Sequence, residues 1–220
     1  MTQATRRVAV LGAGTMGHGI AQVAALAGFD VSLRDTTESY VERGLERIRE
    51  NLDAGVARGK VLPEEREAAL TRIAGHTDLE SAVRDADLVI EAVPEKFALK
   101  CQVLAELERY TPEHAILATN TSSFSISRLQ EACQYAGRVV GLHFFNPVHI
   151  MKLVEVVRGR QTEAAIVTTA TAFATRIGKE PIVVNDAPGF ASSRLGVVLG
   201  LEAMRMVEEG VASPEDIDKA

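Results

Sequence analysis

Three glycines near the N-terminus have the spacing of a loop that binds a dinucleotide. Gly12, Gly14 and Gly17 form a G-x-G-x-x-G pattern between a short apolar strand and an Ala-rich helix pattern. The first glycine permits a tight turn, the second lets backbone N–H groups approach a pyrophosphate, and the third lets the helix pack against its strand. A bare pattern of this kind can be a plain turn, but the flanking strand and helix favour a dinucleotide site that also includes Thr15 and Met16.

A carboxylate at Asp35, which ends the second predicted strand, indicates which dinucleotide binds. Such a group accepts hydrogen bonds from the hydroxyls of the adenine ribose, whereas a 2′-phosphate would meet like charge. At about 4 Å and an effective dielectric constant near 20, this repulsion is on the order of 4 kcal/mol. Strand alternation places Arg34 on the opposite face. The sequence therefore predicts NAD rather than NADP.

A histidine and a glutamate, His143 and Glu155, form a second group of residues that could take part in catalysis. Asn146 and Pro147 break the strand that carries the histidine, and MKLVEVV forms the next strand, so the two side chains can meet across neighbouring strands. A carboxylate that holds one ring nitrogen fixes the tautomer and raises the basicity of the other, which suits proton transfer. From spacing alone, a buried histidine bonded for structural reasons is the stronger interpretation, and both remain open.

Short polar side chains follow another buried strand in the segment ATNTSS. Asn120 and Ser122 can bond a substrate oxygen or the nicotinamide ribose, or they can form an Asx or Ser/Thr turn before the next helix. Glu91 and Glu95 follow the strand before it. A contact to the nicotinamide side of the crevice and a solvated acidic loop explain these two glutamates equally well.

Strand and helix patterns alternate through most of the chain. The predicted strands are one at 8–11, a second that ends at residue 35, and others at 88–90, 115–118, 139–144, 153–157 and 181–184. Helices are predicted at 38–58, 63–72, 98–110 and 164–177. Such alternation predicts an α/β fold with a doubly wound, mostly parallel sheet of the Rossmann type. In such a sheet, ligands bind beyond the carboxyl ends of the strands, where the residues named above cluster.

A turn cluster at 185–189, NDAPG, marks a domain boundary. We therefore expect an NAD-binding domain at 1–186 and the beginning of a helical domain at 187–220. The helix pattern at 190–207 is apolar nearly all round, which predicts burial on more than one side. Ser213 begins a further capped helix that stops within two turns, so the helical domain is expected to be cut short.

Composition excludes several classes of function. The chain has 220 residues, 46% of them hydrophobic, and a net charge of −6. We expect no binding to nucleic acid and none to a membrane, because there is neither a basic patch nor an apolar run long enough to span a bilayer. Cys101 and Cys133 lack metal-ligand spacing, so we expect reduced thiols and no metal. With no recognisable signal peptide, a cytoplasmic location is predicted.

The motifs GAGTMGHGIA, DLVIEAVPE, TNTSS, GLHFFNPVHIMKLVEVV and DAPGF occur in this order and spacing. In them the chain resembles, over essentially its whole length, the L-3-hydroxyacyl-CoA dehydrogenase family, and within it the bacterial 3-hydroxybutyryl-CoA dehydrogenases. The resemblance implies NAD-dependent interconversion of (S)-3-hydroxyacyl-CoA and 3-oxoacyl-CoA in fatty acid metabolism, on a short acyl chain. It implies that His143 is the general acid/base, that Glu155 orients it and that Ser122 bonds the substrate oxygen.

The same resemblance implies binding residues. Contacts to NAD fall on the loop from Gly12 to Gly17 and on Asp35, Glu95, Lys100, Ser122 and Asn146, and contacts to CoA fall on Asn51, Arg58 and Lys60. Members of the family continue for several more helices, which complete the acyl pocket and form a homodimer. In PGFASSR, Ser193 stands where the family often has an active-site asparagine, and a serine has a shorter reach.

Two alternatives remain, one another enzyme and one a protein of a different class. One is a sister NAD-dependent dehydrogenase that acts on a hydroxy acid or sugar acid without CoA. The other is a non-catalytic NAD-binding structural protein on the same scaffold. The combined presence of Ser122, His143 and Glu155 argues against the second.

Replacing Asp35 with alanine should weaken NAD binding by about 1.5–3 kcal/mol, because a charge-assisted hydrogen bond to the ribose is lost. Calorimetric titration with NAD measures the change. Equal or better activity of the unaltered protein with NADP would contradict the assignment.

Overall fold

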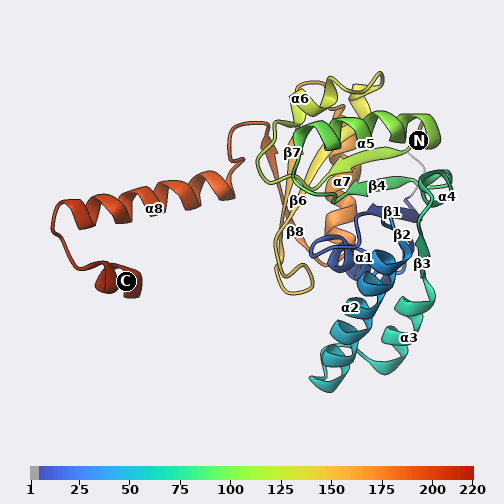
Figure 1. Cartoon of the computed structure of the whole chain (residues 1–220), viewed down its shortest axis with the longest axis horizontal. Helices are drawn as coiled ribbons and strands as arrows, with labels where there is room; N and C mark the ends of the chain where they lie inside the picture. The colour runs from blue at the N-terminus through green and yellow to red at the C-terminus, as the bar shows by residue number, and fades with distance from the viewer. Residues whose placement is uncertain (1–4) are drawn as a thin grey trace.

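A single eight-stranded sheet forms the centre of the protein (Figure 1), in a computed structural model that describes residues 5–220. The strands lie in the order β3-β2-β1-β4-β5-β6-β7-β8, and all neighbours are parallel except β6 and β7. The strands are β1 (Arg7–Leu11), β2 (Asp30–Arg34), β3 (Ile73–His76), β4 (Leu88–Glu91), β5 (Ile116–Thr119), β6 (Val139–Phe144), β7 (Leu153–Arg158) and β8 (Glu180–Asn185). The predicted doubly wound, mostly parallel sheet is confirmed.

Helices cover both faces of this sheet. Residues of α1 and α7 belong to the apolar cluster on one face, and residues of α4, α5 and α6 belong to the cluster on the other. The pair α2 and α3 packs on α1 and projects beyond the sheet (Figure 1). The helices are α1 (Gly17–Leu26), α2 (Glu38–Ala57), α3 (Pro63–Thr71), α4 (Leu79–Val83), α5 (Phe97–Tyr110), α6 (Ile126–Gln130), α7 (Ala164–Arg176), α8 (Ser192–Glu208) and α9 (Pro214–Lys219).

The two apolar clusters hold these helices in place. On one face, the ring of Phe29 lies 5.2 Å from the ring of Phe173 in α7. On the other face, Leu104 and Leu107 of α5 are fully buried in one cluster with Leu117 of β5. A fully buried leucine contributes about 1.5–3 kcal/mol. The helices and the loops that precede them therefore have fixed positions over the sheet.

The glycine-rich loop lies where the strand order reverses, between β1 and β4. Gly12 has a φ of +99°, and a Cβ atom built on it would lie 2.6 Å from the carbonyl oxygen of Ala92 after β4. A Cβ on Gly17 would lie 1.6 Å from the carbonyl oxygen of Gly12, whereas one on Gly14 would meet nothing within 4 Å. The loop therefore packs tightly at its ends and leaves open space at its middle, as a bound pyrophosphate requires.

The strand β3 and the helix α4 were not expected from the sequence. The segment IAGH of β3 holds a glycine and a histidine and lies at the edge of the sheet, so it has no continuous apolar run. Helix α4 has only five residues and begins at an Asp78 cap, whose side chain accepts from the backbone N–H of Ser81 at 2.8 Å. Short edge elements of this kind carry too few residues for a periodic pattern.

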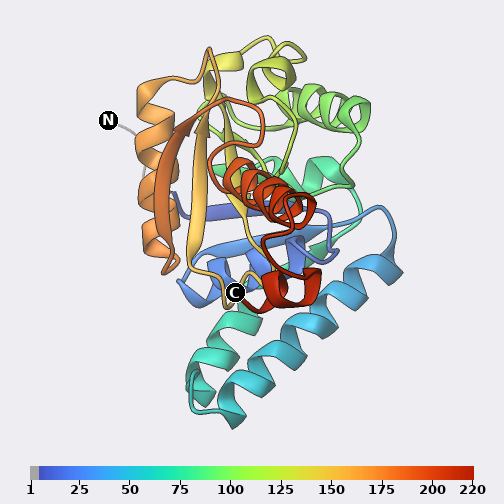
Figure 2. The ribbon, with the colours of Figure 1, turned by 90° about the vertical axis from the view of Figure 1, so that its left-hand side faces the viewer.

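Helix α8 differs from the expectation in two ways. It begins at Ser192 rather than at 190, because Gly189 and Phe190 have positive φ angles of 74° and 49°. The predicted burial on more than one side is wrong for this structure, since α8 projects from the body (Figure 1) and Leu195 and Leu199 are 70% and 73% exposed. Viewed from that side, α8 lies in front of the sheet (Figure 2). Within residues 5–220, none of the helices, α8 included, has the length and apolarity needed to cross a membrane.

Replacing Gly17 with alanine should lower the free energy of unfolding by about 1–3 kcal/mol, because the new methyl group overlaps the backbone of the loop. Urea denaturation followed by circular dichroism measures this loss. The matched control is Gly14→Ala, whose methyl group enters open space and should leave stability nearly unchanged while it weakens NAD binding. Equal stability losses in the two variants would contradict the packing assigned to the loop.

Candidate active site

The antiparallel pairing of β6 and β7 places His143 directly opposite Glu155. The ring nitrogen Nδ1 lies 2.7 Å from the carboxylate oxygen Oε2. His143 is 4% exposed and Glu155 is 0% exposed. The predicted meeting of the two side chains across neighbouring strands is confirmed, while their catalytic role stays a prediction.

Aromatic rings flank the His143 imidazole. The ring of Phe145 lies 4.5 Å away and that of Phe190 lies 5.7 Å away in an edge-on arrangement. Because Glu155 holds Nδ1, the other nitrogen, Nε2, is the atom left for chemistry, and it has no hydrogen-bond partner among residues 5–220. An imidazole held in this way can take or give a proton at Nε2 without turning.

The carboxylate of Glu155 accepts four hydrogen bonds. Besides His143, the backbone N–H groups of Ala191 and Ser192 donate to Oε1 at 3.0 and 2.9 Å, and the Ser192 hydroxyl donates to Oε2 at 2.9 Å. Burial raises the pKa of Glu155, but the hydrogen bonds outweigh burial and hold this pKa below its usual range. The group is therefore kept as a carboxylate that can stabilise a positive imidazolium.

Ser192, the serine that contacts the dyad, was not predicted from the sequence. The motif PGFASSR contains two adjacent serines, and the family resemblance drew attention to Ser193. In the part of the chain that the structure describes, the Ser193 side chain is half-buried and makes no hydrogen bond. Only the backbone turn at Phe190 distinguishes the two, and nothing local in the sequence predicts it.

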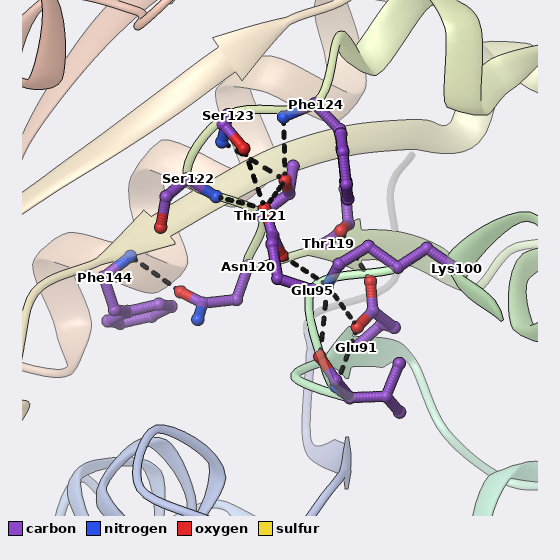
Figure 3. Close-up of polar contacts among 11 residues, drawn as sticks. Glu91, Glu95, Lys100, Thr119, Asn120, Thr121, Ser122, Ser123, Phe124 and Phe144 are labelled. Atoms are coloured by element: carbon purple, nitrogen blue, oxygen red, sulfur yellow. Dashed lines mark hydrogen bonds and ion pairs between the residues drawn. The ribbon is translucent and has the colours of Figure 1, made fainter. Parts of the chain in front are cut away.

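A buried ion pair lies at the carboxyl end of β4 (Figure 3). The Lys100 ammonium lies 2.7 Å from Oε1 of Glu91, and the two side chains are 1% and 0% exposed. The Thr119 hydroxyl donates to Oε2 of Glu91 at 2.6 Å, and the N–H of Val93 donates to Oε1 at 2.8 Å. Glu91 therefore belongs to the core rather than to a solvated acidic loop.

Lys100 also joins this pair to Glu95 and to the loop after β5 (Figure 3). Its ammonium lies 3.2 Å from Oε2 of Glu95, whose Oε1 accepts from the N–H of Ser122 at 3.1 Å and from the Thr121 hydroxyl. Burial raises the pKa of Glu95, but the Thr121 hydrogen bond and the Lys100 charge outweigh it, so the pKa lies below its usual range. The hydroxyl of Ser122 has no partner within the described residues and remains available to a ligand.

Asn120 connects the loop to the histidine strand. Its side-chain oxygen accepts a hydrogen bond from the N–H of Phe144 at 2.9 Å (Figure 3). The expected alternative of a local Asx turn therefore does not describe this oxygen. The contact fixes the residue that follows His143 relative to the end of β5.

Asp35 is tied to the glycine-rich loop. One carboxylate oxygen accepts from the N–H of Ala13 at 2.8 Å, and the other accepts from the N–H of Thr36 at 2.7 Å. Asp35 is half-buried, while Gly14 and Thr15 of the loop are exposed. These residues fit a dinucleotide, since the carboxylate lies beside open backbone.

The remaining predicted residues lie outside these networks. Asn146 is exposed and precedes Pro147 through a cis peptide bond, and Asn51 of α2 donates to the side-chain oxygen of Gln22 at 3.1 Å. Arg58 and Lys60 are exposed at the end of α2. Within residues 5–220, the His, Cys, Asp and Glu side chains form no group that could hold a metal ion.

Comparison with known protein families shows to which family this chain belongs. The sequence profile described as 3-hydroxyacyl-CoA dehydrogenase, NAD binding domain, matches residues 7–187, and the profile of the C-terminal domain of these enzymes matches residues 189–220. The chain belongs to the 3-hydroxyacyl-CoA dehydrogenase family. The resemblance seen in the motifs is confirmed, and NAD is the cofactor.

Relatives within and near this family cover most of the chain. It is 44% identical to a 3-hydroxybutyryl-CoA dehydrogenase of Mycobacterium tuberculosis, over 100% of this chain and 77% of that protein. The crystal structure of (S)-3-hydroxybutyryl-CoA dehydrogenase from Ralstonia eutropha gives a TM-score of 0.94 at 38% identity, over 97% of this chain and 75% of that one. The crystal structure of an NAD+-dependent dismutase, 5-formyl-3-hydroxy-2-methylpyridine 4-carboxylic acid 5-dehydrogenase, gives a TM-score of 0.87 at 36% identity. The match covers 98% of this chain and 69% of that one.

The chain spans a smaller share of some longer relatives. A glyoxysomal fatty acid beta-oxidation multifunctional protein of Brassica napus is 40% identical over 97% of this chain, but the match covers 29% of that protein. The chain therefore spans less than a third of the length of this relative.

Replacing Lys100 with methionine should lower the free energy of unfolding by about 3–5 kcal/mol, because it leaves the buried Glu91 carboxylate without a cation. Urea denaturation measures the loss, and the double variant Glu91→Gln, Lys100→Met should recover part of it. The control is Lys96→Met, which removes an exposed lysine from the same segment. A Lys100→Met loss no larger than that of the control would contradict the assignment of a buried pair.

Proposed function

We propose that this protein is an NAD-dependent dehydrogenase that interconverts (S)-3-hydroxyacyl-CoA and 3-oxoacyl-CoA, with short acyl chains such as 3-hydroxybutyryl and acetoacetyl. The observation that carries the proposal is the His143 and Glu155 pair beside Ser122, in a chain of this family. The names of its relatives in Mycobacterium tuberculosis and Ralstonia eutropha support the choice of substrate.

When held by the loop from Gly12 to Gly17 and by Asp35, NAD would supply the acceptor for the hydride from carbon 3 of the substrate. Nε2 of His143 takes the proton of the 3-hydroxyl group, and in the reverse direction it returns that proton to the 3-oxo group. The Glu155 carboxylate holds Nδ1 at 2.7 Å and stabilises the imidazolium that forms. The free hydroxyl of Ser122 donates to the same substrate oxygen.

The proposed cofactor contacts follow from the geometry around the strand ends. Backbone groups from Gly12 to Gly17 receive the pyrophosphate, and Asp35 receives the adenine ribose. Glu95, Asn120, Ser122 and Asn146 surround the nicotinamide side. Lys100 is 1% exposed and has the carboxylates of Glu91 and Glu95 as partners, so it acts by holding Glu95 in place.

Contacts to the acyl-CoA are proposed for Ser122, for Ser193 at the start of α8, and for Asn51, Arg58 and Lys60 on and after α2. The two cations, both exposed, suit the phosphates of CoA. We also propose the division into domains at 1–186 and 187–220, and a homodimer formed through the C-terminal helices, whose apolar side chains are exposed in this chain. The cytoplasmic location stays a prediction.

One related structure favours a second candidate. The dismutase described above is named for a pyridine carboxylic acid that carries no CoA, so a hydroxy acid without CoA is the alternative substrate. Rates measured side by side with acetoacetyl-CoA, with CoA esters of longer chains and with free acids separate the two. Faster turnover of a free acid would overturn the proposal of an acyl-CoA substrate.

His143→Ala and Glu155→Gln should each lower turnover by about a hundred- to ten-thousand-fold, while NAD affinity hardly changes. The measurements are NADH oxidation with acetoacetyl-CoA and calorimetric titration with NAD. His114→Ala serves as the control, because His114 is 47% exposed and pairs with Asp87. A folded Glu155→Gln protein with an intact rate would rule out the dyad.

A further inference from the structure

The first turn of α8 supplies most of the hydrogen bonds that Glu155 receives. Three of the four come from Ala191 and Ser192, and they bond both carboxylate oxygens. The Ser192 hydroxyl donates at 2.9 Å to Oε2, the oxygen that also accepts Nδ1 of His143 at 2.7 Å. This serine and the histidine therefore share one acceptor atom.

The backbone before α8 is shaped for this contact. Gly189 and Phe190 have φ angles of 74° and 49°, and phenylalanine rarely adopts the left-handed region. The Phe190 ring is 5% exposed and packs edge-on against the ring of His143 at 5.7 Å. The unusual turn is thus anchored beside the histidine, and it directs the next two N–H groups and the Ser192 hydroxyl at Glu155.

We propose that Ser192 is a positioning residue of the dyad, whose hydroxyl holds the Glu155 oxygen facing His143 and limits how strongly that oxygen attracts the Nδ1 proton. Two donors on one carboxylate oxygen compete for the same electron density, so the loss of one strengthens the bond to the other. Without the hydroxyl, Glu155 binds the Nδ1 proton more tightly and favours the protonated imidazole. For turnover, the inference rests on the proposed function of the dyad.

Other charged groups do not provide this effect. Among residues 5–220, neither His143 nor Glu155 forms any other ion pair. The neighbour of Glu155 on β8 is Ile182, and the nearest charged residue along α8 is Arg194, which is exposed. Ser193, one residue further, makes no hydrogen bond within the described chain, so the hydroxyl of Ser192 has no substitute there.

Proton NMR tests the inference without any need for turnover. An Nδ1 proton bonded to a buried carboxylate gives a signal at low field, and His143→Ala assigns that signal by removing it. We expect the signal to move further downfield in Ser192→Ala and Ser192→Val, and to stay near its original position in Ser192→Thr. Threonine and valine have the same shape, so their difference reports the hydroxyl alone. Thr168→Ala, which removes an exposed hydroxyl from α7, should leave the signal unchanged.

The pH dependence of turnover provides a second readout. In the oxidation of (S)-3-hydroxybutyryl-CoA the base must be unprotonated, so Ser192→Ala should shift the acidic limb of kcat/KM to higher pH. We expect a loss of about three- to tenfold at pH 6 that nearly disappears at pH 9. A loss that is constant over this range would indicate a merely structural role.

An unmoved low-field signal in both Ser192→Ala and Ser192→Val would overturn the inference, as would identical signals in the valine and threonine variants. Absence of turnover in every variant, including the unaltered protein, would count against the proposed function instead. The NMR comparison would then still decide the role of Ser192.

Discussion

The acid/base site depends on the antiparallel pairing of β6 and β7. Side chains alternate between the two faces of a strand, so His143 and Glu155 reach the same side only because they lie directly opposite each other. A slip of one residue would move Glu155 to the other face and leave a buried histidine without its acceptor. Asn120, directly after β5, fixes β6 relative to β5, since its side-chain oxygen accepts from the N–H of Phe144.

Among residues 5–220, two glutamates are fully buried, and their surroundings give them different roles. The Glu91 carboxylate lies against the Lys100 ammonium, so its charge is neutralised within the pair and the pair is structural. Within the part of the chain that the structure describes, Glu155 has only His143 as an ionisable partner, and its other donors are N–H groups and a hydroxyl. A carboxylate stabilised by neutral donors keeps its charge available to an imidazolium, which is what proton transfer at His143 requires.

The features that the sequence predicted are those set by short-range spacing. The glycine-rich loop and Asp35 could be predicted because they lie within one consecutive strand, helix and strand. His143 and Glu155 could be paired because their two strands are joined by a short connection. The contact between Ser192 and Glu155 joins residues 37 positions apart in the chain. It requires a left-handed backbone conformation at Phe190, which no sequence pattern predicts. The exposure of α8 could not be predicted for a related reason, because an apolar pattern shows that a helix needs partners but not where those partners lie.

Helix α8 contacts the acid/base pair at its first turn and exposes apolar side chains along the rest of its length. Its N-terminal residues hold the Glu155 carboxylate, whereas Leu195, Val197 and Leu199 along its length are 64–73% exposed. Any group that packs on those side chains constrains the direction of α8 relative to the sheet. Since Ser192 is the first residue of this helix, a change in its direction alters the distance between the hydroxyl and Glu155. The direction of α8 relative to the sheet and the hydrogen bonds that Ser192 makes to Glu155 therefore depend on the same turn of backbone.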